Sequence, residues 1–157
     1  MPRSSTRLIL LLAALAVAPA ASAQPRPTSG YVVYVPDGAS AMALADGRSL
    51  SHGTLRGVLL ADDPASPLHL MTHDCTGTDV LGPDGLPVRG EGVCTSVDAS
   101  GDLYHITYLN TPEQRAWRYT GGTGKFAGIE GSGTTEIAAV GPDGRVTIRF
   151  EGTMQMR

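Results

Sequence analysis

Four histidines are the residues of this chain whose type could hold a metal ion: His52, His69, His73 and His105. His69 and His73 lie four positions apart, a spacing that would make a chelating pair on one face of a helix. Segment 68–74 is instead predicted to be a strand, in which four residues span about 13 Å. Two ligands of one zinc ion each lie about 2 Å from it. We therefore predict scattered surface or turn histidines and no metal site.

Paired carboxylates could perform acid–base chemistry, because burying one beside another raises its pKa. Most candidate acids lie beside glycines or turn residues, which indicates solvated turn and capping roles. The candidates are Asp74, Asp79, Glu91, Asp98 and Asp102. We select Asp74 as a polar site because it borders Cys75 inside a strand-like segment. The spacings identify no catalytic residues.

Cys75 and Cys94 are the two cysteines of the sequence. In an oxidising compartment a minimal even count predicts one disulfide, and two cysteines allow one pairing within the chain. The alternatives are a redox pair or a metal site, but the spacing matches neither C-x-x-C nor a zinc ribbon. Closing a loop of this length should stabilise the fold by roughly 3 kcal/mol.

Aromatic residues alternate along two predicted strands. Tyr104, Ile106 and Tyr108 share one face of the first strand, and Trp117 and Tyr119 share one face of the second. If both faces point into a barrel, they line an apolar pocket with hydroxyl and indole groups for a ligand. The alternative is that these rings fill the core, as side chains do in small eight-stranded barrels.

Two common enzyme motifs are absent from the sequence. There is no G-x-S-x-G nucleophile elbow. Residues 122–125 resemble part of a phosphate-binding loop, but Phe126 stands where Ser or Thr is required. We therefore predict no cofactor, and a non-enzymatic protein is favoured over an enzyme.

The first residues have the order of a cleaved export signal. Arg3 and Arg7 precede an apolar run over 8–18, and the Ala-Ser-Ala at 21–23 is a small-x-small cleavage site. The run is too short to span a bilayer, which needs about 20 residues. We predict a signal peptide over 1–23 and a secreted or periplasmic bacterial protein that does not insert into the membrane after cleavage.

Cleavage would leave 134 of the 157 residues, a length that suits one domain with one core. It would also remove two of the twelve basic residues, and the ten that remain against fifteen acids give a net charge of −5. An acidic chain without a basic run argues against nucleic acid or anionic membranes as partners. The sequence does not indicate an oligomeric state.

Turn signals recur along the rest of the chain, after a Pro-rich leader at 24–29 that we predict to be disordered. Pro-Asp-Gly occurs at 36–38, 83–85 and 142–144. The segments between are short and rich in Val, Ile, Thr and Tyr, which predicts a single all-β domain over 30–157, either a sandwich or a barrel. Predicted strands lie near 31–35, 39–44, 49–61, 68–74, 88–98, 103–110, 116–120, 129–137 and 145–155.

Six glycines within residues 121–134 are accompanied by Phe126 and Ile129, unlike a flexible linker. Glycine permits positive φ and close backbone approach, so the segment suits a tight turn that leads into a strand. We expect that strand to form a hairpin with the strictly alternating residues 145–155. The residues expected to face inward on it are Ile129, Gly131, Gly133, Thr135 and Ile137.

Residues 121–134, with the preceding 117–120, resemble the glycine-rich strand signature of the allene oxide cyclase barrel-like superfamily, which includes dirigent-like proteins. The residues around Cys75 and Cys94 resemble the paired-cysteine layout of its uncharacterised secreted bacterial members. The resemblance implies a closed antiparallel barrel of eight strands with a lumen. It implies neither cyclase nor dirigent activity, because no catalytic position of the family can be matched.

A barrel pattern without a catalytic constellation favours a secreted, non-enzymatic protein that binds a small apolar ligand or serves an envelope or stress role. One alternative is a cyclase or isomerase that acts through the shape of the lumen and one or two polar groups. Another is a secreted protease inhibitor, which requires an exposed, rigid N-terminal segment such as 24–29. A solidly packed lumen would exclude both the binder and the cyclase.

Overall fold

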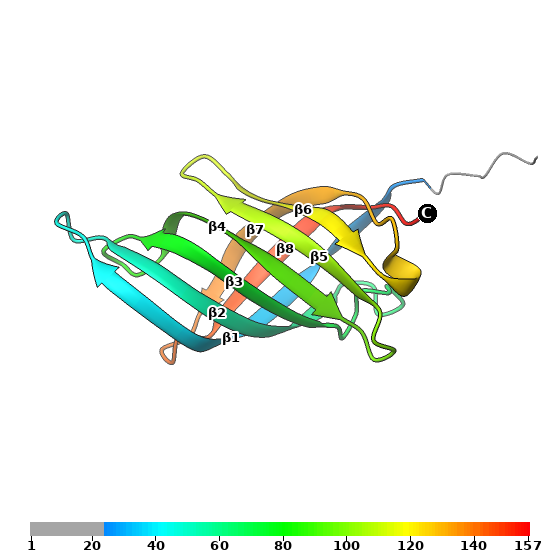
Figure 1. Ribbon diagram of the computed structural model, residues 1–157, viewed down its shortest axis with the longest axis horizontal. Coiled ribbons are helices and arrows are strands. Elements are labelled where there is room, and N and C mark those ends of the chain that lie inside the picture. Colours follow the sequence, from blue (N-terminus) through cyan, green and yellow to red (C-terminus); the bar gives the residue numbers. More distant parts are fainter. Residues whose placement is uncertain (1–23) are drawn as a thin grey trace, which may run out of the picture.

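The computed structural model describes residues 24–157, which form a closed barrel of eight antiparallel strands (Figure 1). Each strand pairs with the next along the chain, and β1 pairs with β8 to close the barrel. The strands are β1 (Arg26–Ala43), β2 (Ser49–Ala61), β3 (Thr72–Leu81), β4 (Pro87–Val97), β5 (Leu103–Asn110), β6 (Arg115–Gly122), β7 (Ser132–Val140) and β8 (Val146–Met154). The predicted all-β fold with eight strands is confirmed, while the predicted signal peptide lies outside the described residues.

The barrel interior is built by alternation along the strands. In β3, His73 and Cys75 are buried, whereas Thr72 and Asp74 are exposed. Such a period of two places one set of side chains in the lumen and the other in solvent. The described residues contain no helix long and apolar enough to cross a membrane.

β1 is one long strand where the sequence predicted two strands and a disordered leader. Residues 26–29 pair with β8, so the predicted leader is wrong for these four residues. The ladder with β8 closes the barrel and satisfies the backbone groups that a free Pro-rich segment would leave to water. The register shifts between Pro36 and Ala39, so the predicted turn is a bulge within the strand.

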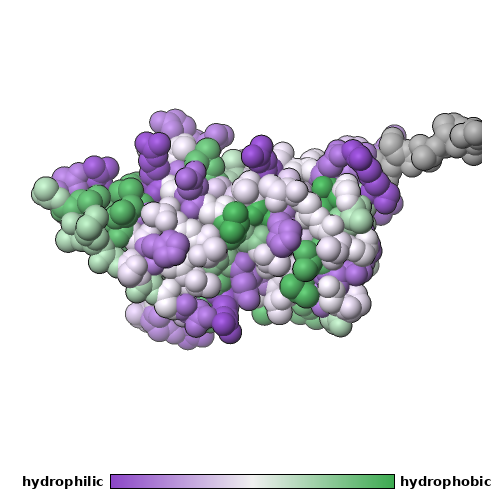
Figure 2. Space-filling view, in the orientation of Figure 1, coloured by the Kyte–Doolittle hydropathy of each residue, from purple (hydrophilic) through white to green (hydrophobic). Residues whose placement is uncertain are grey.

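Beyond that bulge the β1–β2 hairpin projects past the rest of the barrel (Figure 1). Apolar side chains gather at this end of the molecule (Figure 2). Met42, in the last part of β1, is 58% exposed. The hairpin therefore extends one wall of the barrel beyond its rim.

The end of the barrel that holds both described termini is closed by large apolar side chains. Leu68 and Met71 come from the β2–β3 loop, and each is at most 1% exposed. The prediction of a strand over 68–74 was therefore wrong for its first four residues, because β3 begins at Thr72. Leu68 and Met71 pack across the end of the barrel instead. Phe126, Ile129 and Met154 complete this closed end.

The glycine-rich segment forms part of the same closed end. β6 ends at Gly122, and a single 3-10 turn, η1 (Gly124–Phe126), precedes β7. Gly124 has a φ of 52°, and a Cβ on it would collide with the carboxylate of Asp102. Because β7 begins at Ser132, Ile129 lies before the strand and not on its inward face as predicted.

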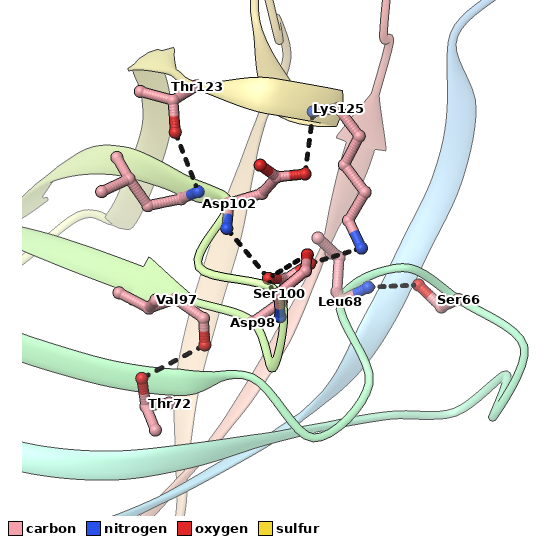
Figure 3. A network of polar contacts seen from close by, with 10 residues as sticks. Ser66, Leu68, Thr72, Val97, Asp98, Ser100, Asp102, Thr123 and Lys125 are labelled. Carbon is pink, nitrogen blue, oxygen red and sulfur yellow. Dashed lines mark hydrogen bonds and ion pairs between the residues drawn. The ribbon is translucent and has the colours of Figure 1, made fainter.

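A polar network ties the β4–β5 loop to η1 beside the closed end (Figure 3). The Asp98 carboxylate accepts hydrogen bonds from the Ser100 backbone and hydroxyl, both at 2.8 Å, and pairs with Lys125 at 2.5 Å. Asp102 accepts a bond from the Lys125 backbone at 3.1 Å. The bond from Lys125 is the main reason that the pKa of Asp98 lies below its usual range. These two acids therefore act as turn and loop anchors.

Candidate functional site

The barrel encloses a cavity of about 370 Å³. Its wall runs from Leu68 and Tyr104, next to the closed end, to Gly85 and Gly144 in two hairpin turns at the opposite end. The four hairpin turns at 44–48, 82–86, 111–114 and 141–145 surround that opposite end, which we call the mouth. The lumen is thus hollow, closed at one end and reached from the other.

Glycines on the inward faces of the strands make room for the large rings. A Cβ on Gly92 would lie 2.5 Å from the Tyr108 ring, and one on Gly133 would lie 2.6 Å from the Trp117 ring. Real Cβ atoms do not approach so closely, so these rings lie directly over bare backbone. The glycines therefore widen the lumen at the level of Tyr108 and Trp117.

All five residues predicted to line a lumen lie on the cavity wall: Tyr104, Ile106, Tyr108, Trp117 and Tyr119. Tyr104 and Tyr119 meet edge to face at 5.1 Å between ring centroids, as do Trp117 and Tyr119. Edge-to-face contact is one of the arrangements that pairs of aromatic rings prefer. The Trp117 indole donates a hydrogen bond to the Thr134 carbonyl at 3.2 Å, so its position is fixed. The five residues form one rigid aromatic wall, and their role toward a ligand stays a prediction.

A polar cluster lines the mouth half of the cavity. The Tyr108 hydroxyl donates to Asp79 Oδ2 at 3.4 Å, and the Asn110 amide donates to Asp79 Oδ1 at 3.3 Å. Arg115 also lines the cavity and donates to the Pro87 carbonyl at 2.7 Å. These side chains come from the mouth-side ends of β3, β5 and β6, which the barrel closure brings together.

The carboxyl group of Asp79 is half-buried at this position. Burial raises its pKa, and the hydrogen bonds from Asn110 and Tyr108 and the charge of Arg115 oppose that rise. Burial also raises the pKa of Tyr108, and the neighbouring carboxylate adds to this rise. An acid and a hydroxyl held in this way can hydrogen bond to a polar group of a ligand or exchange a proton with it.

A second set of polar groups lies deeper, toward the closed end. His73 and Ser96 are buried, and His73 Nδ1 lies 2.5 Å from the Ser96 hydroxyl oxygen. Burial lowers the pKa of His73 to about 4, so its ring is neutral near pH 7. Burial raises the pKa of Tyr104 to about 12, with an opposing hydrogen bond from Ser96. The deep end of the lumen is therefore polar in places but uncharged.

Three of the four histidines lie on the surface or in a loop as predicted, and one does not. His52 and His105 are exposed and hydrogen bond to threonines of neighbouring strands, and His69 lies in the β2–β3 loop. His73 is instead 4% exposed and lines the lumen. It shares the inward face of β3 with Cys75, and this alternation with Cys75 was the signal that could have placed it inside.

The structure also places the selected acid outside the lumen. Asp74 is exposed on the outer face of β3, because it is next to the buried Cys75 and successive side chains point to opposite faces. The acid on the cavity wall is Asp79, four residues after Cys75 and on the same face. Asn110 and Arg115 also line the mouth, although nothing in their local sequence singled them out.

Cys75 and Cys94 form the predicted disulfide. They are directly opposite each other on β3 and β4, and both are buried on the cavity wall. The Tyr34 hydroxyl lies 3.2 Å from the sulfur of Cys75. The bridge therefore joins two adjacent strands at the middle of the lumen.

The barrel fold is similar to that of two dirigent proteins of known structure. The structure of the pterocarpan synthase dirigent protein GePTS1 matches with a TM-score of 0.54 at 15% identity, over 94% of this chain and 97% of that one. The structure of the pterocarpan synthase dirigent protein PsPTS1 matches with a TM-score of 0.51 at 14% identity, over 86% and 97%. The chain has the same barrel fold as these two dirigent proteins.

At these identities the likeness extends to the fold of the dirigent-like barrel and not to its activity. No protein-family model matches the sequence, and no curated protein matches it. The part of the predicted resemblance that names allene oxide cyclases and secreted bacterial members stays a prediction.

Proposed function

We propose that this dirigent-like barrel binds a small, elongated and mainly apolar ligand in its lumen without changing it chemically. The observation that carries the proposal is the cavity of about 370 Å³, which lies within the size range of small-molecule sites. Its wall is mostly apolar and aromatic, with a few polar groups at fixed positions, as in other ligand pockets. An envelope or stress role would follow from the ligand that the lumen carries.

The polar groups define how the ligand would lie. An apolar or aromatic body would pack against Trp117 and Tyr119, and a hydroxyl or carbonyl group would meet Asp79 and Tyr108 at the mouth. A hydrogen-bonding group at that end would add a bond to the half-buried carboxylate of Asp79, beyond those from Tyr108 and Asn110. The ligand class is therefore an amphipathic small molecule with one polar end.

Filling the lumen is expected to weaken dye binding. Thr135 lines the cavity from β7, so Thr135→Phe adds a ring where the ligand would lie. We expect the affinity for 8-anilinonaphthalene-1-sulfonate, measured by its fluorescence and by quenching of the single tryptophan, Trp117, to fall at least about tenfold, since every 1.4 kcal/mol is tenfold.

The matched control is Thr134→Phe, the same change at the next residue of β7, whose side chain is exposed on the outer face. This variant should bind the dye like the unmodified protein. Equal dye affinity in both variants would show that the dye binds outside the lumen and would contradict the proposal. Native mass spectrometry of protein purified from its own host tests it independently, since a bound small molecule is expected there.

A cyclase or isomerase acting in the lumen is the second candidate, favoured by Asp79 beside the hydroxyl of Tyr108. A positioned acid or base contributes about 10²- to 10⁴-fold to a reaction. Ligand released from the host-purified protein and returned to ligand-free protein should come back unchanged if the barrel only binds it. The enzyme is favoured instead if the unmodified protein converts the ligand and Asp79→Asn slows that conversion about 10²- to 10⁴-fold while keeping its affinity for the dye.

The proposed location is secreted or periplasmic. The predicted signal peptide and the Cys75–Cys94 disulfide support it, because disulfides persist in oxidising compartments. The N-terminal residue of protein recovered from outside the cytoplasm checks the predicted cleavage before Gln24. The inhibitor alternative loses support because residues 26–29 are paired in β1 and do not form a free segment.

A further inference from the structure

We propose that reduction of the Cys75–Cys94 disulfide creates a site for a soft divalent metal ion of the zinc class, held by the two cysteine sulfurs and His73. In the described part of the chain, these three residues have ligand atoms within 4.8 Å of one another, and all three are buried. Thiolate sulfur together with imidazole nitrogen is a donor set that zinc prefers. The inference is independent of any organic ligand in the lumen.

The strand register builds this donor set. Cys75 lies directly opposite Cys94 on the neighbouring strand, with 4.0 Å between their Cα atoms. His73 precedes Cys75 by two residues, so both side chains point into the lumen from β3. Two sulfurs that share a zinc ion at about 2.3 Å each lie roughly 3.8 Å apart in a tetrahedral site. Opening the sulfur–sulfur bond allows that separation by side-chain rotation, while the backbone ladder holds both strands.

The surroundings of His73 suit a ligand histidine. Ser96 occupies Nδ1, which leaves Nε2 as the nitrogen that can face an ion. In most histidine metal sites, a hydrogen bond at the ring nitrogen that does not bind the ion orients the ring. Two thiolates and a neutral imidazole around a divalent ion carry no net charge, so the complex avoids the cost of burying a charge. The lumen beside these residues leaves a fourth position for water or another small ligand.

The formation of the site balances as a two-electron reduction followed by metal exchange. A dithiol reductant gives two electrons and two protons to the disulfide, so the sulfur–sulfur bond breaks, two thiols form and the dithiol itself closes to a disulfide. The ion then forms two bonds to sulfur and one to nitrogen, and the two thiol protons pass to water. Reductant and ion both reach the residues through the mouth of the lumen.

The test is a titration of the full secreted chain with Co²⁺ after reduction by a phosphine, which takes an oxygen from water as the disulfide becomes two thiols. We expect one ion per chain, a thiolate-to-cobalt charge-transfer band, the visible bands of a tetrahedral ion, and displacement by Zn²⁺. The oxidised chain should show none of these bands. Absence of the bands after complete reduction would overturn the proposal.

Variants separate the three-residue site from simple binding to two thiols. His73→Ala should weaken Co²⁺ binding by about tenfold or more, and Ser96→Ala, which removes only the orienting hydroxyl, should weaken it by about tenfold. His105→Ala is the matched control, since His105 is a strand histidine on the outer face, and should bind like the unmodified chain. Near-ultraviolet circular dichroism must show that the reduced chain keeps its barrel. Unfolding on reduction, or normal binding by His73→Ala, would contradict the proposal.

Discussion

Replacing Phe126 by alanine is expected to lower the free energy of unfolding by about 3–5 kcal/mol, the usual cost of truncating a fully buried Phe. Phe126 has no exposed surface and packs edge to face on Tyr104, with 5.3 Å between the ring centroids. It also closes the barrel end, so its removal would leave a void that η1 can fill only by moving. The midpoint of urea unfolding, followed by Trp117 fluorescence, measures the change.

Two further variants show whether the effect comes from the closed end. Phe126→Leu keeps most of the buried volume and should lose less stability than Phe126→Ala. Leu109→Ala removes an apolar side chain that is 43% exposed on the outer face, so it should cost much less. Equal losses in Phe126→Ala and Leu109→Ala would mean that the barrel end is not closed by packing.

Alternation within single strands made the barrel wall predictable from the sequence. A period of two alone placed Tyr104 with Tyr108 on one face, and Trp117 with Tyr119 on one face, because that period is a local property of an extended backbone. The disulfide was predictable for a different reason, since two cysteines in an oxidising compartment leave one pairing within the chain. Both predictions needed no knowledge of how distant segments meet.

The ends of the barrel depend on contacts between distant segments, and there the sequence misled. The predicted strand 68–74 included Leu68 and Met71, yet both pack at the closed end because the β2–β3 loop folds across the lumen. Likewise, residues 26–29 were predicted to be disordered from composition, while their partner β8 lies more than a hundred residues away in sequence. Local propensity gives no information about such partners.

The polar site shows how much depends on one residue of register. Asp74 was selected because it adjoins Cys75, but adjacent residues of a strand point to opposite faces. Asp79 has the correct parity relative to Cys75, yet only barrel closure brings Tyr108 and Asn110 to its carboxylate. Alternation along the strand could therefore have identified Asp79 as the inward-facing acid. Its hydrogen-bond partners could be identified only from the three-dimensional fold.

Replacing both cysteines by alanine is expected to lower the free energy of unfolding by roughly 3 kcal/mol while the barrel is retained. The bridge spans 19 positions, and in the chain-entropy model a loop of this size restricts the unfolded chain by about that amount. Domains of this size have total stabilities of about 5–15 kcal/mol, so the folded state should persist at 25 °C. Urea unfolding of Cys75→Ala/Cys94→Ala beside the oxidised chain measures the difference.

The same experiment on the reduced, unmodified chain tests the physical cause. If the bridge acts mainly by restricting the unfolded chain, phosphine-reduced protein and the double alanine variant should lose similar stability. A much larger loss in the variant would instead assign the effect to packing of the buried sulfurs against Tyr34 and the rest of the lumen wall. The first outcome leaves a folded barrel with two free thiols beside His73, which is the state that the proposed metal site requires. Adding Zn²⁺ should then restore stability to the reduced chain and not to the variant.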